Sequence, residues 1–345
     1  MKIIHCADIH LGAPINGFPK EVSEGRKREV RNTFLRMVEY AKENDVRVIL
    51  LSGDVFDRDK PFKKDVDLFY GAVESNPDID FLYLRGNHDN EGERREFANL
   101  KTFSTEWTSY EYGDVIISGI ELVNENSISM YSTLSLDAKK KNIVMLHGQV
   151  GGDINLVKLR EKNIDYLALG HLHAYAQGKV DGRGMYAYSG CLEGRGFDET
   201  GVKGFILLDV EDKVVHTFQP FSKRSIEEIK LDVSGLQDGY AMARLAKAQI
   251  AFRRENIYRI ELVGEIDAQT DEFAADVQRL LERECAYVSV KDKTKKKIDY
   301  TAYDGDNSLK GEFVRTVLAS EYTEEEKAQM IAYGLKALVG REVDA

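Results

Sequence analysis

Five short apolar runs of this chain each end in a small group of histidine, aspartate, asparagine or glycine residues. The runs lie at 2–6, 47–51, 81–84, 142–146 and 165–169, and their length and composition predict buried strands. Neighbouring strands can bring their ends to one edge of a sheet, where the ligand sites of α/β proteins tend to form. This repeated pattern predicts sheets that share one polar site at their edge.

The groups that follow the five runs are Asp8-Ile9-His10, Gly53-Asp54, Gly86-Asn87-His88-Asp89, His147-Gly148 and Gly170-His171-Leu172-His173. They contain five of the seven histidines, so histidine is concentrated at predicted strand ends. The other two, His5 and His216, lie within predicted strands, where we expect them to be structural.

Amphipathic and β-rich segments complete the first 220 residues. Apolar residues at spacings of three and four predict helices over 22–44 and 61–75, and a short helix is expected near 154–162. A further strand is expected over 114–122, and 185–188, 204–210 and 214–218 are hairpin-like. Because crossovers alternate with antiparallel pairs, the predicted fold class is α/β, with layers rather than a regular doubly wound sheet.

The pattern changes around residues 221–224. We therefore predict a first domain over 1–224, a small α/β domain over 225–300 and a C-terminal helical segment over 301–345. The small domain has a helix–strand–helix–strand pattern, with helices near 236–254 and 269–285. In the last segment Thr323-Glu324-Glu325-Glu326 is typical of a capping box that begins a helix.

Composition limits the classes of function and the compartment. The net charge, 48 − 59 = −11, argues against a protein that coats nucleic acid without a partner. No apolar run approaches the roughly 20 residues that a membrane span needs, and the first residues have no signal-peptide layout. Three widely separated cysteines, Cys6, Cys191 and Cys285, fit a reducing compartment. We expect a cytoplasmic protein without a membrane segment.

The donors in the five groups are suited to metal chemistry. Carboxylate, amide and imidazole groups without thiolates fit divalent manganese, iron or zinc. Seven candidate ligands are too many for one tetrahedral zinc, but they suit two ions if one carboxylate bridges them. Two such ions can activate water for hydrolysis of a phosphate ester. The alternative is a chance coincidence of motifs, which becomes remote when five occur in order at strand ends.

In that order, the five motifs resemble the calcineurin-like metallophosphoesterase family. Within it, Ala7-Asp8-Ile9-His10-Leu11-Gly12, Gly53-Asp54-Val55-Phe56-Asp57 and Tyr188-Ser189-Gly190-Cys191-Leu192-Glu193 resemble the SbcD-type DNA repair exonucleases, including a shorter YhaO-like branch. The resemblance implies a layered α-β-β-α sandwich over about residues 1–220. It also implies a cap formed by the second domain.

The resemblance also assigns roles to residues. Asp8, His10, Asp54 and His173 would hold one ion, and Asp54, Asn87, His147 and His171 the other, with manganese expected in both places. His88 would face the phosphate and protonate the leaving oxygen or stabilise its charge. Asp89 would orient His88 through a hydrogen bond, or would simply form the turn. Arg195 is a further candidate for contact with a phosphate.

The substrate and partners are left more open. The resemblance implies a DNA exonuclease and endonuclease that works with an SbcC-like coiled-coil ATPase docked on the C-terminal helices, and it allows a homodimer. The amphipathic pattern of 327–338 predicts either a face that binds a partner or a face that packs within its own domain. Two other functions remain open: a phosphodiesterase or phosphatase for small nucleotides, and a regulatory subunit that acts mainly through assembly with the ATPase.

Overall fold

The computed structural model describes residues 1–57, 61–89, 95–266, 273–296 and 300–338. Two six-stranded sheets form the first 220 residues, in the orders β12-β11-β1-β2-β3-β4 and β5-β6-β7-β8-β10-β9. The strands of the first sheet are β1 (Lys2–Cys6), β2 (Val46–Ser52), β3 (Asp80–Leu84), β4 (Leu100–Thr102), β11 (Gly204–Val210) and β12 (Val214–Pro220). Those of the second are β5 (Thr108–Tyr112), β6 (Val115–Gly119), β7 (Lys141–His147), β8 (Tyr166–Gly170), β9 (Ala176–Lys179) and β10 (Met185–Tyr188).

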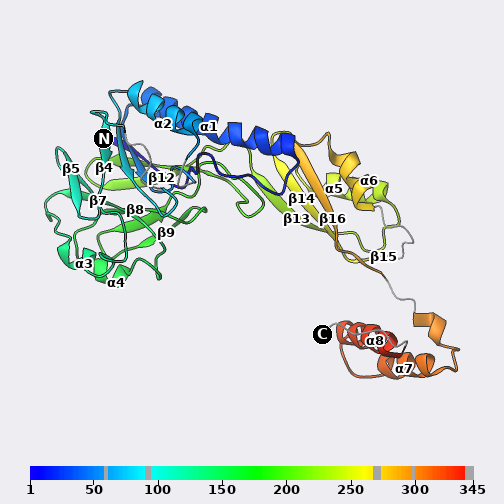
Figure 1. Cartoon of the computed structure of the whole chain (residues 1–345). Coiled ribbons are helices and arrows are strands. Elements are labelled where there is room, and N and C mark those ends of the chain that lie inside the picture. The colour runs from blue at the N-terminus through cyan, green and yellow to red at the C-terminus, as the bar shows by residue number, and fades with distance from the viewer. Residues whose placement is uncertain (58–60, 90–94, 267–272, 297–299, 339–345) are drawn as a thin grey trace.

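The alternation of side chains along β2 shows how the layers are built. Ile49 and Leu51 pack beneath the two long helices α1 (Lys20–Glu43) and α2 (Lys63–Glu74). Val48 and Leu50 point the other way, into the core between the sheets. The short helices α3 (Met130–Thr133) and α4 (Leu156–Leu159) cover the outer face of the second sheet (Figure 1). The layers are therefore α-β-β-α, which confirms the predicted fold class.

Local pattern was least informative for short or polar elements. The helix expected over 154–162 is only the single turn of α4, and the strand expected over 114–122 is limited to 115–119. The strands β4, β5 and β9 were not predicted. The sequence of β9 is Ala-Gln-Gly-Lys, so its strand character comes from antiparallel pairing with β10 rather than from an apolar run.

A third, parallel sheet follows, with the order β13-β14-β16. Its strands are β13 (Ile226–Asp232), β14 (Ile257–Val263) and β16 (Tyr287–Asp292), and its helices are α5 (Gly239–Gln249) and α6 (Phe273–Leu281). This unit has its own apolar core, which includes Leu231, Tyr258 and Val277. We call it the cap sheet. The strands β15 (Glu265–Ile266) and β17 (Lys295–Lys296) pair as a separate two-stranded sheet.

The C-terminal unit consists of a 3-10 turn (Tyr300–Tyr303), α7 (Leu309–Leu318) and α8 (Glu324–Leu338). Val314, Val317 and Ile331 form its buried centre. The predicted capping box is confirmed at the start of α8, because the Thr323 N–H donates to Glu326 and the Glu326 N–H donates to Thr323 Oγ1. Residues 267–272, 297–299 and 339–345 of the predicted second and third segments, with the start of the helix expected at 269, lie outside the described residues.

Candidate metal centre

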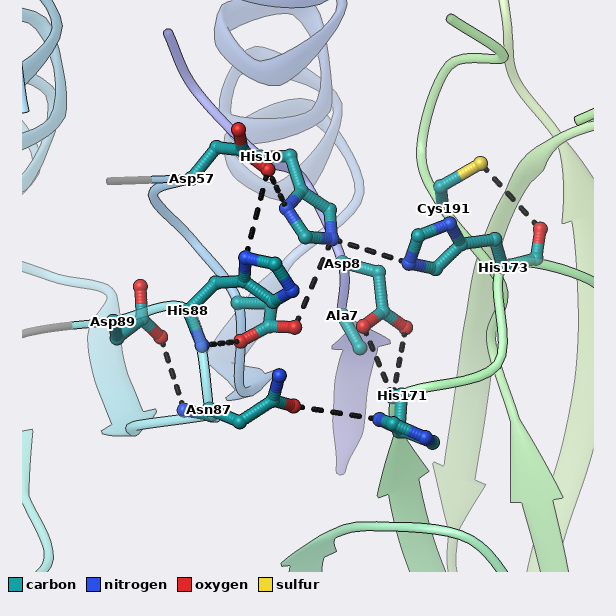
Figure 2. Close-up of polar contacts among 12 residues, drawn as sticks. Ala7, Asp8, His10, Asp57, Asn87, His88, Asp89, His171, His173 and Cys191 are labelled. Atoms are coloured by element: carbon teal, nitrogen blue, oxygen red, sulfur yellow. Dashed lines mark hydrogen bonds and ion pairs between the residues drawn. The ribbon is translucent and has the colours of Figure 1, made fainter. Parts of the chain in front are cut away.

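Five strands deliver the predicted site residues to one edge of the molecule. The strands β1, β2 and β3 run parallel in the first sheet, and β7 and β8 run parallel in the second, so their carboxyl ends coincide. Figure 2 shows side chains from both sheets converging there. The seven candidate ligands gather at this place: Asp8, His10, Asp54, Asn87, His147, His171 and His173.

The imidazoles form two groups. On one side the Nε2 atoms of His10 and His173 lie 3.1 Å apart. On the other, Asn87 Oδ1 lies 3.0 Å from His147 Nε2 and 3.4 Å from His171 Nδ1. Imidazole nitrogens and an amide oxygen at these distances are atoms that a cation placed among them could bind.

Asp54 lies between the two groups. Its Oδ2 is 3.7 Å from His10 Nε2 and 3.3 Å from His147 Nε2, and the residue is only 1% exposed. Asp8, also buried, has a carboxylate oxygen within 4.8 Å of ligand atoms in both groups. The donor set and its arrangement therefore fit a metal site in which a carboxylate is shared.

Three of the imidazoles are oriented by hydrogen bonds between Nδ1 and an oxygen atom on the side away from the centre. Nδ1 of His10 lies 2.8 Å from Asp57 Oδ1, and Nδ1 of His173 lies 2.7 Å from Glu199 Oε1. His147 Nδ1 lies 2.9 Å from the carbonyl oxygen of Ser52. Because these oxygens can only accept, Nδ1 of each ring donates to them and Nε2 is the atom that faces the centre, as in metal-binding histidines.

Asp57 and Glu199 are functional residues that sequence reasoning did not assign. Asp57 had a weak signal, since it closes the Gly-Asp-Val-Phe-Asp motif three residues after Asp54. Glu199 had none, because 26 residues separate it from His173 and only the fold brings the two together. His5 and His216 lie elsewhere, with His5 bonded to the Tyr166 hydroxyl and His216 to Gln177.

Backbone strain is concentrated at the site. Asp8, His10, Asp54 and His171 have φ values of 53°, 50°, 53° and 105°, in the left-handed region that non-glycine residues rarely adopt. Such conformations cost about 1–3 kcal/mol each and persist where the surroundings impose them. Here backbone hydrogen bonds do so, from Asp8 N to Gly53 O and from His10 N to Asp54 O, both 3.0 Å.

Gly86 is required for a reason that the sequence did not reveal. A Cβ at this position would lie 2.2 Å from Asp54 Oδ1. The loop after β3 can therefore approach Asp54 only with glycine there. This approach lets the His88 N–H donate to Asp54 Oδ1 over 2.8 Å and fixes that carboxylate.

Asp89 forms the turn. Its carboxylate accepts hydrogen bonds from the backbone N–H groups of Val55, Phe56 and Gly86, at 3.2, 2.8 and 3.1 Å. These bonds match the turn-forming alternative, not the expected contact with His88. The His88 imidazole instead faces Asp57, with Nδ1 3.8 Å from Oδ1, and it is about half exposed (Figure 2).

The charges of the site compensate one another. Burial raises the pKa of Asp8 to about 7. Burial opposes a charge on His147, but its hydrogen bond to Asp54 and the charge of that carboxylate raise the pKa of His147 to about 9. Burial lowers the pKa of His10 and of His171. Burial opposes a charge on Asp54, but the hydrogen bonds of His147 and of the His88 N–H lower its pKa to about 2. Asp8 and His147 are therefore the groups whose protons a metal ion would displace.

The Arg195 guanidinium lies behind the metal centre. It donates through Nε to Glu199 Oε1 over 3.0 Å and lies 3.5 Å from Asp57 Oδ1. It therefore contacts the carboxylates that orient His173 and His10, and it is largely buried. A direct contact with a phosphate, which the sequence suggested, is not favoured by this placement.

A cavity of about 260 Å³ adjoins the second imidazole group. Asn87, His147 and His171 form one side of it, and Leu122 and Ser127 are among the residues that form the other. The site is therefore open to a ligand on the side of Asn87.

The model of the calcineurin-like phosphoesterase family matches residues 1–175. The chain belongs to this family. The match covers half of the chain, including all five strand ends, and confirms the family that the motifs indicated.

Two relatives and one solved structure are similar to this family member. It is 25% identical over 260 residues to the DNA double-strand break repair protein Mre11 of Sulfurisphaera tokodaii. The aligned region covers 67% of this chain and 63% of that protein. It is 22% identical over 362 residues to the protein of the same name from Sulfolobus acidocaldarius, covering 94% and 92%. A dimetal phosphatase from Danio rerio is 12% identical with a TM-score of 0.42, covering 63% of this chain and 99% of that one. The phosphoesterase thus spans less than two thirds of the first of these relatives.

Among the described residues, no helix of the phosphoesterase has the length and apolar character needed to cross a membrane.

Proposed function

We propose that this phosphoesterase is a two-metal phosphodiester hydrolase that cuts DNA and works with an SbcC-like ATPase. The observation that carries the hydrolase part is the position of Asp54 between two imidazole groups. Asp8, His10, Asp54 and His173 would hold one ion, and Asp54, Asn87, His147 and His171 the other. Manganese is our first choice because the family resemblance implies it, and the oxygen and nitrogen donors without thiolates fit manganese as they fit iron or zinc. When bound, two such cations supply positive charge to the phosphate and lower the pKa of a water.

The chain itself would supply the proton for the leaving group. His88 is the candidate, because its imidazole is half exposed at the edge of the site while its backbone is fixed on Asp54. Asp57 Oδ1 lies 3.8 Å from His88 Nδ1. A protonated imidazole can donate to an alkoxide as it forms.

DNA as the substrate is supported by the relatives named for double-strand break repair. The net charge of −11 is unfavourable for DNA binding by the chain alone, which supports a partner that contributes basic surface. The C-terminal unit has exposed apolar side chains for such contact, including Met330, Tyr333 and Leu309, which is 71% exposed. In contrast, Ile331 and Leu335 of the amphipathic pattern pack within the unit.

The test is a Mn²⁺-dependent assay on linear duplex DNA, single-stranded DNA and cyclic dinucleotides, with and without the ATPase. We expect DNA cleavage that chelation abolishes and that Asp54→Ala lacks. Arg183→Gln is a matched control, because Arg183 pairs with Asp165 in the same domain without contacting the metal centre. Hydrolysis of the cyclic dinucleotides alone would replace the nuclease with the small-nucleotide phosphodiesterase. Activity of neither kind without the ATPase would favour the regulatory subunit.

A further inference from the structure

Residues 193–199 form a segment that lies behind one side of the metal centre, and we call it the backing segment. Glu199 near its end is 3% exposed, and its Oε1 lies 2.7 Å from His173 Nδ1. The other carboxylate oxygen accepts from the backbone N–H of Arg195 over 2.7 Å. The carboxylate is thus held by its own segment while it orients His173.

Arg195 connects this carboxylate to the other sheet. Its guanidinium lies between Glu199 and Asp57, and Asp57 in turn lies 2.8 Å from His10 Nδ1. One buried cation therefore holds the two carboxylates that orient the two imidazoles. Those imidazoles come from different sheets, 163 residues apart, and their Nε2 atoms are only 3.1 Å from each other.

Both ends of the backing segment are tied to the rest of the molecule. At its start, the buried Glu193 accepts from Arg26 and from the Thr33 hydroxyl of α1, each over 2.8 Å. Near its end, the Phe197 ring packs on Phe18 with centroids 5.1 Å apart, and the Arg259 guanidinium of β14 lies 3.8 Å from the ring centroid. Phe197 is thus the contact between this segment and the cap sheet.

A buried ion pair of this kind is an expensive way to stabilise a fold. Desolvating a carboxylate and a guanidinium can cost more than their attraction returns, so apolar side chains would stabilise the segment at least as well. Here the Glu199 carboxylate holds the ring of His173, whose side chain is 33% exposed, through a direct hydrogen bond. A metal ligand held in this way loses less freedom when the ion binds.

We propose that Glu199 and Arg195 are positioning residues that hold His173 and His10 as ligands of one ion, and that the cap sheet keeps them in place through Phe197. The inference rests on the proposed two-metal function. It predicts that substitutions in the backing segment weaken the binding of one ion and leave unchanged the binding of the other, at Asn87, His147 and His171.

The test is a Mn²⁺ titration of the full chain by calorimetry and by electron paramagnetic resonance. For Glu199→Ala we expect one of the two ions to bind about 10–100-fold more weakly, the usual effect of removing such a partner, with the other ion unchanged. Glu199→Gln should recover most of this affinity, because its amide oxygen still accepts from His173 Nδ1. Arg183→Gln serves as the matched control and should bind both ions as the wild type does.

A second readout needs no metal. In ¹⁵N-histidine spectra of the metal-free protein, His173 should be the Nδ1–H tautomer in the wild type and in Glu199→Gln, and should lose that preference in Glu199→Ala. If Glu199→Ala does not fold, Arg195→Gln replaces it, with the same loss of one ion expected. Unchanged affinity for both ions in a folded Glu199→Ala or Arg195→Gln protein overturns the proposal.

The contact with the cap sheet is tested by Phe197→Ala. This substitution should lower the affinity for the same ion as Glu199→Ala does, but by a smaller factor. Phe252→Ala is the control, because Phe252 packs on Tyr258 within the cap unit, with ring centroids 4.9 Å apart. Equal, wild-type affinities in both variants would reject the role of the cap sheet. These titrations contain no substrate, so failure to cut DNA leaves the inference standing. A wild-type protein that does not bind two metal ions would contradict both the inference and the proposed two-metal function.

Discussion

At the scale of single residues, adjacent positions at one strand end have different tasks. Asn87 offers a neutral oxygen to His147 and His171, His88 presents a half-exposed imidazole beside Asp57, and Asp89 holds the turn. Asp54 Oδ2 lies within 4 Å of an imidazole of each group, at 3.7 Å from His10 Nε2 and 3.3 Å from His147 Nε2. Substitutions at neighbouring positions should therefore separate metal binding from hydrolysis.

For His88→Ala we expect both ions to remain while hydrolysis falls by about 10²–10⁴-fold, the usual contribution of a general acid. The reason is that the imidazole lies at the edge of the site rather than among the candidate ligands. Metal analysis and single-turnover kinetics on the same preparation measure the two effects. Loss of an ion together with the activity would instead make His88 a ligand.

For Asp54→Ala we expect the loss of both ions, because the carboxylate lies between the two groups. Inductively coupled plasma analysis after dialysis against Mn²⁺ gives the stoichiometry, and circular dichroism checks that the protein is folded. A folded variant with two ions per chain would refute the bridging position.

Metal affinity should fall as the pH falls. A raised pKa means that a proton occupies the group below that pH and must leave when the ion binds. With the pKa of His147 at about 9, the affinity should drop by up to about tenfold per pH unit below pH 9. Below pH 7 protonation of Asp8, with its pKa at about 7, should steepen the drop to about 100-fold per unit. Calorimetric titrations at several pH values would show the slope, and a flat profile between pH 9 and 6 would contradict this prediction.

At the scale of elements, α1 connects the sheet, the backing segment and the cap. Arg26 on α1 is 2% exposed and donates to Glu193 and to the Gly194 carbonyl. Glu29, one turn further along, pairs with Arg224 at the entry to the cap sheet. Through Arg26 and Glu29, α1 therefore contacts both the start of the backing segment and the entry to the cap sheet.

Arg26→Ala should destabilise the protein by roughly 3–5 kcal/mol, because it leaves the buried Glu193 carboxylate without its cation. The free energy of unfolding in urea measures this loss. Arg28→Ala is the matched control on the same helix, since Arg28 is exposed, and it should change stability by less than about 0.5 kcal/mol. A similar, small change in both variants would mean that the buried pair is not needed for stability.

At the scale of the whole molecule, three units have separate apolar cores. The phosphoesterase sandwich, the cap sheet and the C-terminal helix pair each bury their own cluster. Separate cores allow one unit to be removed without exposing the interior of another. The C-terminal pair is the unit that we propose for docking on the ATPase.

Deletion of residues 300–345 should leave metal content and the unfolding midpoint of the sandwich unchanged and should abolish capture by the ATPase. A pull-down with the full chain as control measures the capture, and metal analysis reports on the site. Retained capture would move the docking surface to another unit, and loss of metal would show that the C-terminal helices support the sandwich.

Residue type and local spacing were enough to predict the layered fold and a candidate metal centre. Apolar runs predict strands, and the donors that follow them predict metal ligands, because both depend only on local sequence. The five groups contain all seven candidate ligands.

Only the tertiary structure decided what surrounds those ligands. Asp57, Glu199 and Arg195 are brought behind His10 and His173 by strand order and by a long connection, and no local pattern records such a contact. Glycine is required at position 86 because Asp54 lies too close for a Cβ there. Asp89 is needed because its carboxylate accepts from a backbone N–H of the loop after β2. Polar elements such as β9 became strands through their neighbours. Local sequence therefore indicated which groups are candidate metal ligands, while long-range packing decided how each of them is held.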